Sequence, residues 1–143
     1  TSAEKFRVMM ENNELLEHAH VYGNWYGVPR QSVKQALDAG QDTIVRVDVQ
    51  GAANIKKLLP KAVFIFLMPP SIEDLFTRLK SRRTESEKEM TLRLKTAEDE
   101  IKQLPLFDYT VINHWNEINR ATDEIKSIIT AEKNRKTACG ISL

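Results

Sequence analysis

Three arginines in the stretch from residue 75 to residue 98 have the chemistry needed to bind a polyanion. Arg78 and Arg82 lie one helical turn apart, and Arg93 follows an acidic, hydroxyl-rich break. Guanidinium groups remain charged at physiological pH, and their forked N–H groups match the oxygens of a phosphate. A solvated hairpin whose arginines pair with nearby glutamates explains the same pattern, and charge alone favours that plainer interpretation.

Glu17 is a carboxylate in an apolar setting. Residues 14–22 alternate in polarity like a half-buried strand, which places Glu17 on one face with Leu15, Ala19 and Val21. An unpaired buried charge is unfavourable, so this carboxylate needs hydrogen-bond donors. An Arg or Lys side chain could supply them, or a bound ligand could, and the sequence leaves both alternatives open.

Two further polar residues lie at or near the ends of apolar stretches. Asp48 lies near the end of the stretch 43–49, and Asn113 follows the stretch 109–112. Ligands of open α/β sheets bind beyond the carboxyl ends of the strands. An apolar strand that ends in Asp has the form of a Walker B segment, whose acid lies near a nucleotide's magnesium, but helix capping is the commoner reason for such an Asp.

The remaining candidates carry weaker signals. Tyr26 offers a phenol beside Gly27, whose backbone a ligand could approach closely, although a turn glycine and a packed tyrosine explain the pair as well. His18 and His20 share a strand face, but no third ligand is spaced to complete a metal site. Cys139 has no evident base partner near it in the sequence, so a nucleophilic role is not expected.

Composition narrows the classes of function. The 143 residues suffice for one domain with a core, and the 41% apolar and 29% charged content is typical of globular proteins. A net charge of +1 provides no general attraction to nucleic acid or to an acidic membrane, and no apolar run approaches the length of a membrane span. With a single cysteine the chain cannot form an internal disulfide, so we expect a reducing, cytoplasmic location.

The hydrophobic pattern predicts an α/β protein. Apolar strands at 43–49, 62–68 and 109–112 alternate with helices, which indicates a parallel sheet flanked by helices. Before residue 62, the other predicted elements are a helix over 1–12, hairpin strands over 14–22 and 25–28, a helix from Pro29 to Gly40 and a helix ending near Leu59. After the second apolar strand, a helix is predicted to follow Pro69-Pro70-Ser71, and a further helix begins with a capping box of Ser86 and Glu89. A closing helix is predicted over 115–131.

Six motifs follow one another along the chain: NNELLEHAHVYGNWYGVP, VDVQGA, VFIFLMPPS, LFTRLKSRRTES, RLKTAEDE and FDYTVIN. Their order closely resembles guanylate kinase, from about Phe6 to Ala131. The resemblance implies a P-loop NTPase-like nucleoside monophosphate kinase core that is truncated at its N-terminus. It also implies three regions: the remainder of a small GMP-binding subdomain at 1–40, a core α/β domain at 41–75 and 99–143, and a helical lid at 76–98.

The resemblance implies that the γ-phosphoryl group of ATP is transferred to GMP, with Mg²⁺ accompanying ATP and no metal ligand assigned to the protein. On the acceptor side, Glu17 matches the carboxylate that accepts hydrogen bonds from guanine, and Tyr26 matches the tyrosine that binds the GMP phosphate. Gly27 allows close backbone approach, and Asp48 matches the acid near the acceptor nucleotide and magnesium.

On the donor side, the resemblance implies that the lid arginines close on the phosphates and stabilise charge on the transferred group. These catalytic residues are Arg78, Arg82 and Arg93. Arg78, Arg82 and Asn113 are the residues implied to contact ATP. GMP and ATP are therefore the expected partners, with no role for nucleic acid or a membrane.

The chain also departs from the family pattern. Val28 stands where a Ser or Thr usually contacts the base, Arg46 stands where an acid often precedes Asp48, and Arg83 replaces a common lid glycine.

The largest departure concerns the phosphate loop. The five glycines cannot form a G-x-x-x-x-G-K-[ST] phosphate loop. We therefore expect this chain to be a C-terminal portion of a guanylate kinase that is inactive alone and that self-associates through the sheet edge left by the missing first strand. The alternative is a guanylate-kinase-like interaction module without catalysis.

Overall fold

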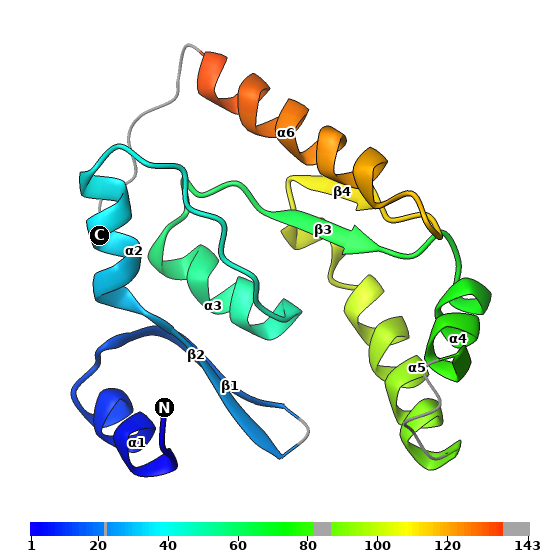
Figure 1. The fold of residues 1–143 in the computed structure, drawn as a ribbon, viewed down its shortest axis with the longest axis horizontal. Coiled ribbons are helices and arrows are strands. Elements are labelled where there is room, and N and C mark those ends of the chain that lie inside the picture. The colour runs from blue at the N-terminus through cyan, green and yellow to red at the C-terminus, as the bar shows by residue number, and fades with distance from the viewer. Residues whose placement is uncertain (22, 82–86, 136–143) are drawn as a thin grey trace. The chain divides into compact units, whose positions relative to one another are not determined.

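A computed structural model describes residues 1–21, 23–81 and 87–135 (Figure 1). The chain divides into two compact units, residues 1–62 and a second unit that starts at Val63, and each is described by itself. Both contain helices and a small sheet, so the predicted α/β class is confirmed, whereas the division into subdomain, core and lid stays a prediction.

The first unit begins with helix α1 and a β-hairpin. Helix α1 (Ala3–Glu11) starts at Ser2, whose hydroxyl accepts a hydrogen bond from the backbone N–H of Lys5 at 3.2 Å. Strands β1 (Leu15–Val21) and β2 (Asn24–Pro29) pair in antiparallel fashion, as the alternation and the turn signal predicted. Gly23 in the turn has φ +80°, a conformation that glycine adopts without strain.

A bulge in β1 changes which residues the hairpin buries. Leu15 pairs with Pro29 and Glu17 pairs with Val28, so Leu16 is an extra residue in β1. As a result the three consecutive residues 15–17 are all buried. The prediction of strict alternation is therefore wrong at this point, because an inserted residue shifts the two-residue period by one.

Two helices complete the first unit. Helix α2 (Arg30–Asp38) follows Pro29 as predicted and buries Val33. Helix α3 (Val49–Leu58) starts at Asp48, whose Oδ1 accepts the backbone N–H of Gly51 at 2.7 Å. Asp48 is therefore a helix N-cap, which is the structural alternative weighed for it above.

The predicted strand over 43–49 is wrong. Residues 41–48 are neither helix nor strand, and Ile44 is 77% exposed. A strand exists only where a neighbouring strand supplies hydrogen bonds to its backbone, and none of the described strands pairs with this segment. The apolar sequence is suited to a sheet interior, but within the described chain it has no sheet to enter.

The second unit contains a two-stranded parallel sheet, formed by β3 (Ile65–Met68) and β4 (Tyr109–Ile112). Asp108 joins the starts of the two strands, since its Oδ2 accepts the backbone N–H of Phe64 at 2.8 Å. Val111 in β4 has no exposed surface. Both strands were predicted, although β3 begins three residues later than the apolar run that contains it.

The second unit also contains helices. Helix α4 (Ile72–Ser81) starts at Ser71, whose hydroxyl accepts the N–H of Asp74 at 3.1 Å, as the Pro-Pro-Ser signal predicted. Helix α5 (Glu87–Ile101) packs against α4, and a short 3-10 helix, η1 (Leu104–Leu106), leads to β4. The predicted capping residue Ser86 lies outside the described residues.

The closing helix α6 (Ile118–Asn134) begins three residues later than predicted, because Asn116 has φ +57° and ends any helix there. Its buried face carries Ala121 and packs on β4, where the hydroxyl of Tyr109 donates to Glu132 at 2.6 Å. That hydrogen bond raises the pKa of Tyr109 and lowers the pKa of Glu132.

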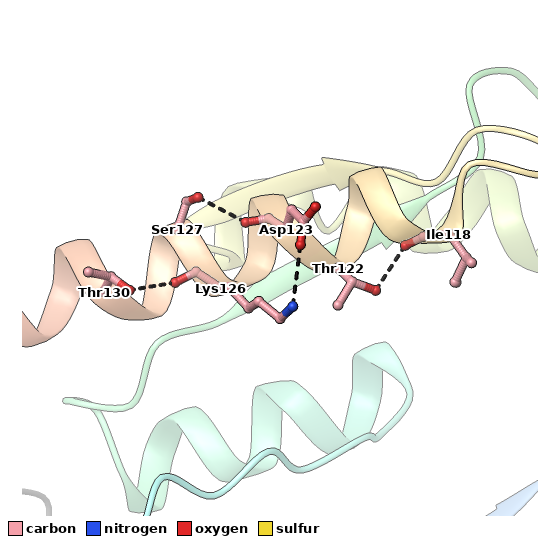
Figure 2. Close-up of polar contacts among 6 residues, drawn as sticks. All are labelled: Ile118, Thr122, Asp123, Lys126, Ser127 and Thr130. Atoms are coloured by element: carbon pink, nitrogen blue, oxygen red, sulfur yellow. Dashed lines mark hydrogen bonds and ion pairs between the residues drawn. The ribbon is translucent and has the colours of Figure 1, made fainter.

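The exposed face of α6 satisfies its own polar groups. Figure 2 shows hydroxyl groups that donate to the carbonyl oxygen four residues earlier, a pattern typical of Ser and Thr in helices. The pairs are Thr122 with Ile118, Ser127 with Asp123 and Thr130 with Lys126, at 2.8, 2.8 and 2.9 Å, and the Lys126 ammonium donates to the Asp123 carboxylate at 3.3 Å. This face is a solvated surface rather than a reactive one.

Candidate functional site

Glu17 is the single buried charged side chain among the described residues, with 7% of its surface exposed. It lies on β1 against the first turn of α3. A Cβ atom built onto Gly51 would lie 2.8 Å from Cδ and 2.9 Å from Oε1 of Glu17. The carboxylate therefore fills the space that a side chain at position 51 would occupy.

Asp48 lies beside the same glycine. Its Oδ1 holds the N–H of Gly51 and would be 3.1 Å from the built Cβ, so two carboxylates flank Gly51. Burial raises the pKa of Glu17, the negative charge of Asp48 raises it further, and the neighbouring His18 lowers it. The site thus stabilises the protonated form of Glu17 unless a cation or hydrogen-bond donors offset the charge.

No described residue donates a hydrogen bond or an ion pair to the Glu17 carboxylate. Of the two alternatives left open by the sequence, a partner Arg or Lys is therefore not seen in the described chain. A carboxylate accepts several hydrogen bonds, and this one has its acceptor capacity unused. The arrangement is suited to a ligand that presents donors.

Tyr26 and Val28 lie on the same face of the hairpin as Glu17. Val28 is directly opposite Glu17 in the pairing, and Tyr26 is opposite Ala19, one step further along that face. Tyr26 is 56% exposed, so its phenol is accessible to a ligand in solution. Three of the residues predicted to bind GMP therefore belong to the first unit: Glu17, Asp48 and Tyr26.

Gly27 allows Leu15 and Phe6 to pack closely against its backbone, which the sequence did not reveal. A Cβ atom there would lie 3.0 Å from Cδ1 of Leu15 and 3.0 Å from the ring of Phe6 in α1. The missing side chain therefore makes room for packing, and the predicted close approach of a ligand at Gly27 stays a prediction. The alternative weighed above, a turn glycine beside a packed tyrosine, does not describe the pair, because Gly27 lies within β2 and Tyr26 is 56% exposed.

The two strand histidines pack on an aromatic ring. The rings of His18 and His20 lie 6.1 and 4.8 Å from that of Trp25, and Phe6 of α1 lies 5.9 Å from it. Within the described ranges, no three His, Cys, Asp or Glu side chains cluster as metal ligands would.

In the second unit Arg78 is held by its own chain. Its Nη2 donates to the backbone oxygen of Asn113 at 2.6 Å, and its guanidinium lies 5.4 Å from the ring centre of Trp115. Its Nε is buried and has no hydrogen-bond partner among the described atoms. Arg78 is therefore oriented, with a donor still unused.

The other predicted donor-side residues are less well assembled. Arg93 lies half-buried on α5 and already interacts with a neighbour, and Arg82 and Arg83 lie outside the described residues. Asn113 follows β4, where its N–H donates to the carbonyl oxygen of Met68 at 2.9 Å. The structure brings Arg78 and Asn113 together but does not place the whole set.

Two residues of these clusters were missed in the sequence. Trp115 contacts Arg78 and is 49% exposed, and the signal for it was an aromatic residue two positions after Asn113. Gly51 lies in α3 against Glu17, and its signal was a glycine directly before the predicted helix that ends near Leu59.

None of the helices in the described part of the chain combines the length and apolar character that a bilayer crossing requires.

Comparison with known proteins shows similarity over nearly the whole chain. Residues 1–132 match the family model for guanylate kinase. Curated guanylate kinases from Desulfitobacterium hafniense and Halalkalibacterium halodurans are 45% and 44% identical over 94% and 92% of this chain. A crystal structure of guanylate kinase from Anaplasma phagocytophilum superimposes with a TM-score of 0.78 and 34% identity over 99% of this chain.

The chain spans only part of those relatives. It covers 66% of the Desulfitobacterium protein, 63% of the Halalkalibacterium protein and 66% of the Anaplasma chain.

Proposed function

This chain belongs to the guanylate kinase family, and we propose that it carries the guanine-recognising part of an enzyme that transfers the γ-phosphoryl group of ATP to GMP. The products are ADP and GDP. The observation that carries the proposal is the buried Glu17 carboxylate, which lies beside Asp48 and receives no hydrogen bond within the described chain.

Guanine supplies the donors that Glu17 lacks. Its ring N1–H and its exocyclic amino group lie side by side, so one carboxylate can accept a hydrogen bond from each. Adenine has an acceptor at N1 and no amino group at C2, so it would leave the carboxylate buried and unpaired. A site that loses such hydrogen bonds with the wrong base discriminates strongly between bases.

The other residues of the first unit have complementary roles in this proposal. The accessible phenol of Tyr26 binds the phosphate of GMP from the same face of the hairpin. Asp48 lies near the acceptor nucleotide. Its Oδ1 accepts the backbone N–H of Gly51, so Oδ2 is the oxygen that would interact with the nucleotide. Val28 cannot supply the polar contact that a Ser or Thr would make to the base.

The second unit supplies the donor side. Arg78 and Arg82 bind the phosphates of ATP, Asn113 lies at its adenine, and Arg93 joins them to stabilise charge on the transferred group. Phosphoryl transfer depends on positioning and on charge stabilisation more than on a covalent nucleophile. An arginine such as Arg78, which stays charged and is oriented by its hydrogen bond to the backbone oxygen of Asn113, is suited to that task.

Magnesium fits this donor set as a partner of ATP. Mg²⁺ keeps several waters and is bound through one or two carboxylates together with substrate phosphates, so it needs no cluster of protein ligands. Within the first unit, the group with the right chemistry for such an ion is the Oδ2 atom of Asp48. When bound, the ion supplies positive charge that offsets the charge of the phosphates.

Nucleotide binding by the 143-residue polypeptide tests the proposal. We expect calorimetry to show binding of GMP and at least tenfold weaker binding of AMP, because only guanine pairs with Glu17. Equal affinity for the two nucleotides would contradict guanine selectivity. Binding of a phosphopeptide without binding of GMP would instead identify a non-catalytic interaction module.

Two further expectations concern the polypeptide itself. Since its sequence contains no G-x-x-x-x-G-K-[ST] motif, we propose that it turns over little GMP and ATP on its own in a coupled ADP-release assay. Substantial turnover would show that another segment binds the donor phosphates. Self-association through a sheet edge and a cytoplasmic location also remain proposals, and light scattering tests the first.

A further inference from the structure

We propose that Gly51 is a specificity-determining positioning residue, whose missing side chain leaves the space in which the Glu17 carboxylate is held for guanine. The inference rests on the proposed function and assigns a residue to it that the motifs did not. Gly51 acts through the position of Glu17 and does not itself contact the substrate.

The distances show that position 51 tolerates no side chain while Glu17 stays in place. A built Cβ atom would lie 2.8 Å from Cδ and 2.9 Å from Oε1 of Glu17. Non-bonded heavy atoms are most stable about 3.5–4.0 Å apart, so even the methyl group of alanine would displace the carboxylate.

The backbone gives no other reason for glycine at this position. Gly23 and Gly40 have positive φ angles of +80° and +69°, a conformation that favours glycine, but Gly51 does not belong to this group. It lies in the first turn of α3, and glycine is a poorer helix former than any other residue except proline. The physical reason that remains is the space beside the carboxylates, where Glu17 lies nearer to the built Cβ atom than Asp48 does.

The helix cannot easily move aside to accommodate a larger residue. The N–H of Gly51 is held by Asp48 at 2.7 Å, and Ala52 and Ile55 of the same helix are each only 6% exposed. The carboxylate of Glu17 is the end of a flexible side chain, so it is the group that would shift. Such a shift would change the direction of its two oxygens without unfolding the unit.

The decisive variant is Gly51→Ala, measured by calorimetry with GMP and with AMP. We expect GMP to bind about tenfold more weakly, the effect of misplacing one charged hydrogen bond, while AMP binding is unchanged. The melting temperature should be equal or higher, because alanine favours the helix. Asn54→Ala, an exposed substitution in the same helix, is the matched control and should change neither affinity.

A second pair of variants tests whether the effect passes through Glu17. Aspartate at position 17 is one methylene shorter, so it should not reach the methyl group at position 51. We therefore expect Gly51→Ala to weaken GMP binding less than threefold when it is added to Glu17→Asp. A full tenfold loss in both backgrounds would overturn the positioning role.

The outcomes separate this inference from the proposed function. If the unmodified chain binds GMP and Glu17→Gln loses that binding, unchanged affinity in Gly51→Ala overturns only the role of Gly51. If the unmodified chain discriminates no better than twofold between GMP and AMP, the proposed function itself fails. A lower melting temperature with equal losses for both nucleotides would also overturn the inference, since it indicates a packing role.

Discussion

Glu17 in the first unit and Arg78 in the second are both charged side chains predicted to bind a nucleotide, but their surroundings differ. Glu17 is buried, is fixed against Gly51 and receives no hydrogen bond from the described residues. Arg78 is half-buried, and its guanidinium already donates to Asn113 and lies over Trp115. The Glu17 carboxylate therefore has no hydrogen-bond donor among the described residues, whereas the Arg78 guanidinium already has a hydrogen-bond acceptor and an aromatic ring beside it.

This difference indicates two ways of preparing a binding site. A buried carboxylate without donors raises the free energy of the empty protein, and a ligand with matching donors lowers it, so selectivity follows. An arginine held by a carbonyl oxygen and a ring is oriented at little cost and still has unused N–H groups. We therefore expect substitutions in the first unit to change base selectivity, and those in the second to change affinity for phosphates.

The largest effect is expected for Glu17→Gln. The amide presents one acceptor and an unwanted donor to guanine, so one hydrogen bond is lost and the other is no longer made to a charged group. GMP should therefore bind about 100-fold more weakly. Calorimetry measures the change, and AMP binding should not weaken, because the amide can donate a hydrogen bond to N1 of adenine. A change below threefold would contradict a guanine-reading role for this carboxylate.

A core substitution tests whether the two units are independent. Val111→Ala removes a side chain that is fully buried in β4 and should lower the free energy of unfolding of the second unit by about 2 kcal/mol. Urea unfolding measures it, with Val63→Ala, which alters a 41% exposed residue, as the control. GMP affinity should not change, and a change would show that the units are coupled.

A smaller effect is expected for Arg78→Ala. We expect it to weaken ATP binding about tenfold and to leave GMP binding unchanged, because it removes one charged hydrogen-bonding group on the donor side. Calorimetry with ATP measures the binding, because it does not depend on the contact between Arg78 and Trp115 that the substitution removes. Lys80→Ala, on the same helix, is the control, and an equal loss there would indicate only nonspecific charge attraction.

The smallest effect is expected in the pH dependence of stability. Burial, and then Asp48, raise the pKa of Glu17 above its usual 4.5. The folded state therefore favours the protonated form, and this contribution to stability is present below pH 4.5 and is lost as pH rises through the folded pKa. In the Glu17→Gln variant the amide at position 17 has no proton to lose. The free energy of unfolding of the variant should therefore rise relative to that of the unmodified chain as pH rises.

Urea unfolding of the two proteins from pH 4 to pH 8 measures this difference. All other titrating groups are shared by both proteins and cancel in the comparison. A variant that becomes relatively less stable at higher pH would mean that donors absent from the described residues stabilise the ionised carboxylate.

Local sequence signals predicted much of the fold. Ser2 and Ser71 begin helices because their hydroxyl groups satisfy N–H groups of the first turn, which depends only on neighbouring residues. The hairpin and both strands of the parallel pair could be found from local patterns as well, and the same patterns singled out Glu17 and Asp48 as candidate site residues. The site was predicted from motifs and from one carboxylate with apolar neighbours.

The failures have non-local causes. The stretch 43–49 has the composition of a buried strand but forms none, because a strand needs hydrogen bonds from another segment. The bulge at Leu16 changed which side chains are buried, because the register of one strand depends on its partner.

By itself, the sequence determined most of the helices and strands, the caps at Ser2 and Ser71 and the chemical types of the candidate site residues, because these depend on side chains close together in the chain. Only the tertiary structure decided that Glu17 lies against Gly51, that Gly27 makes room for Phe6 and that Arg78 lies over Trp115. Each of these contacts joins segments far apart in sequence, so none of them follows from the neighbours of a residue in the chain.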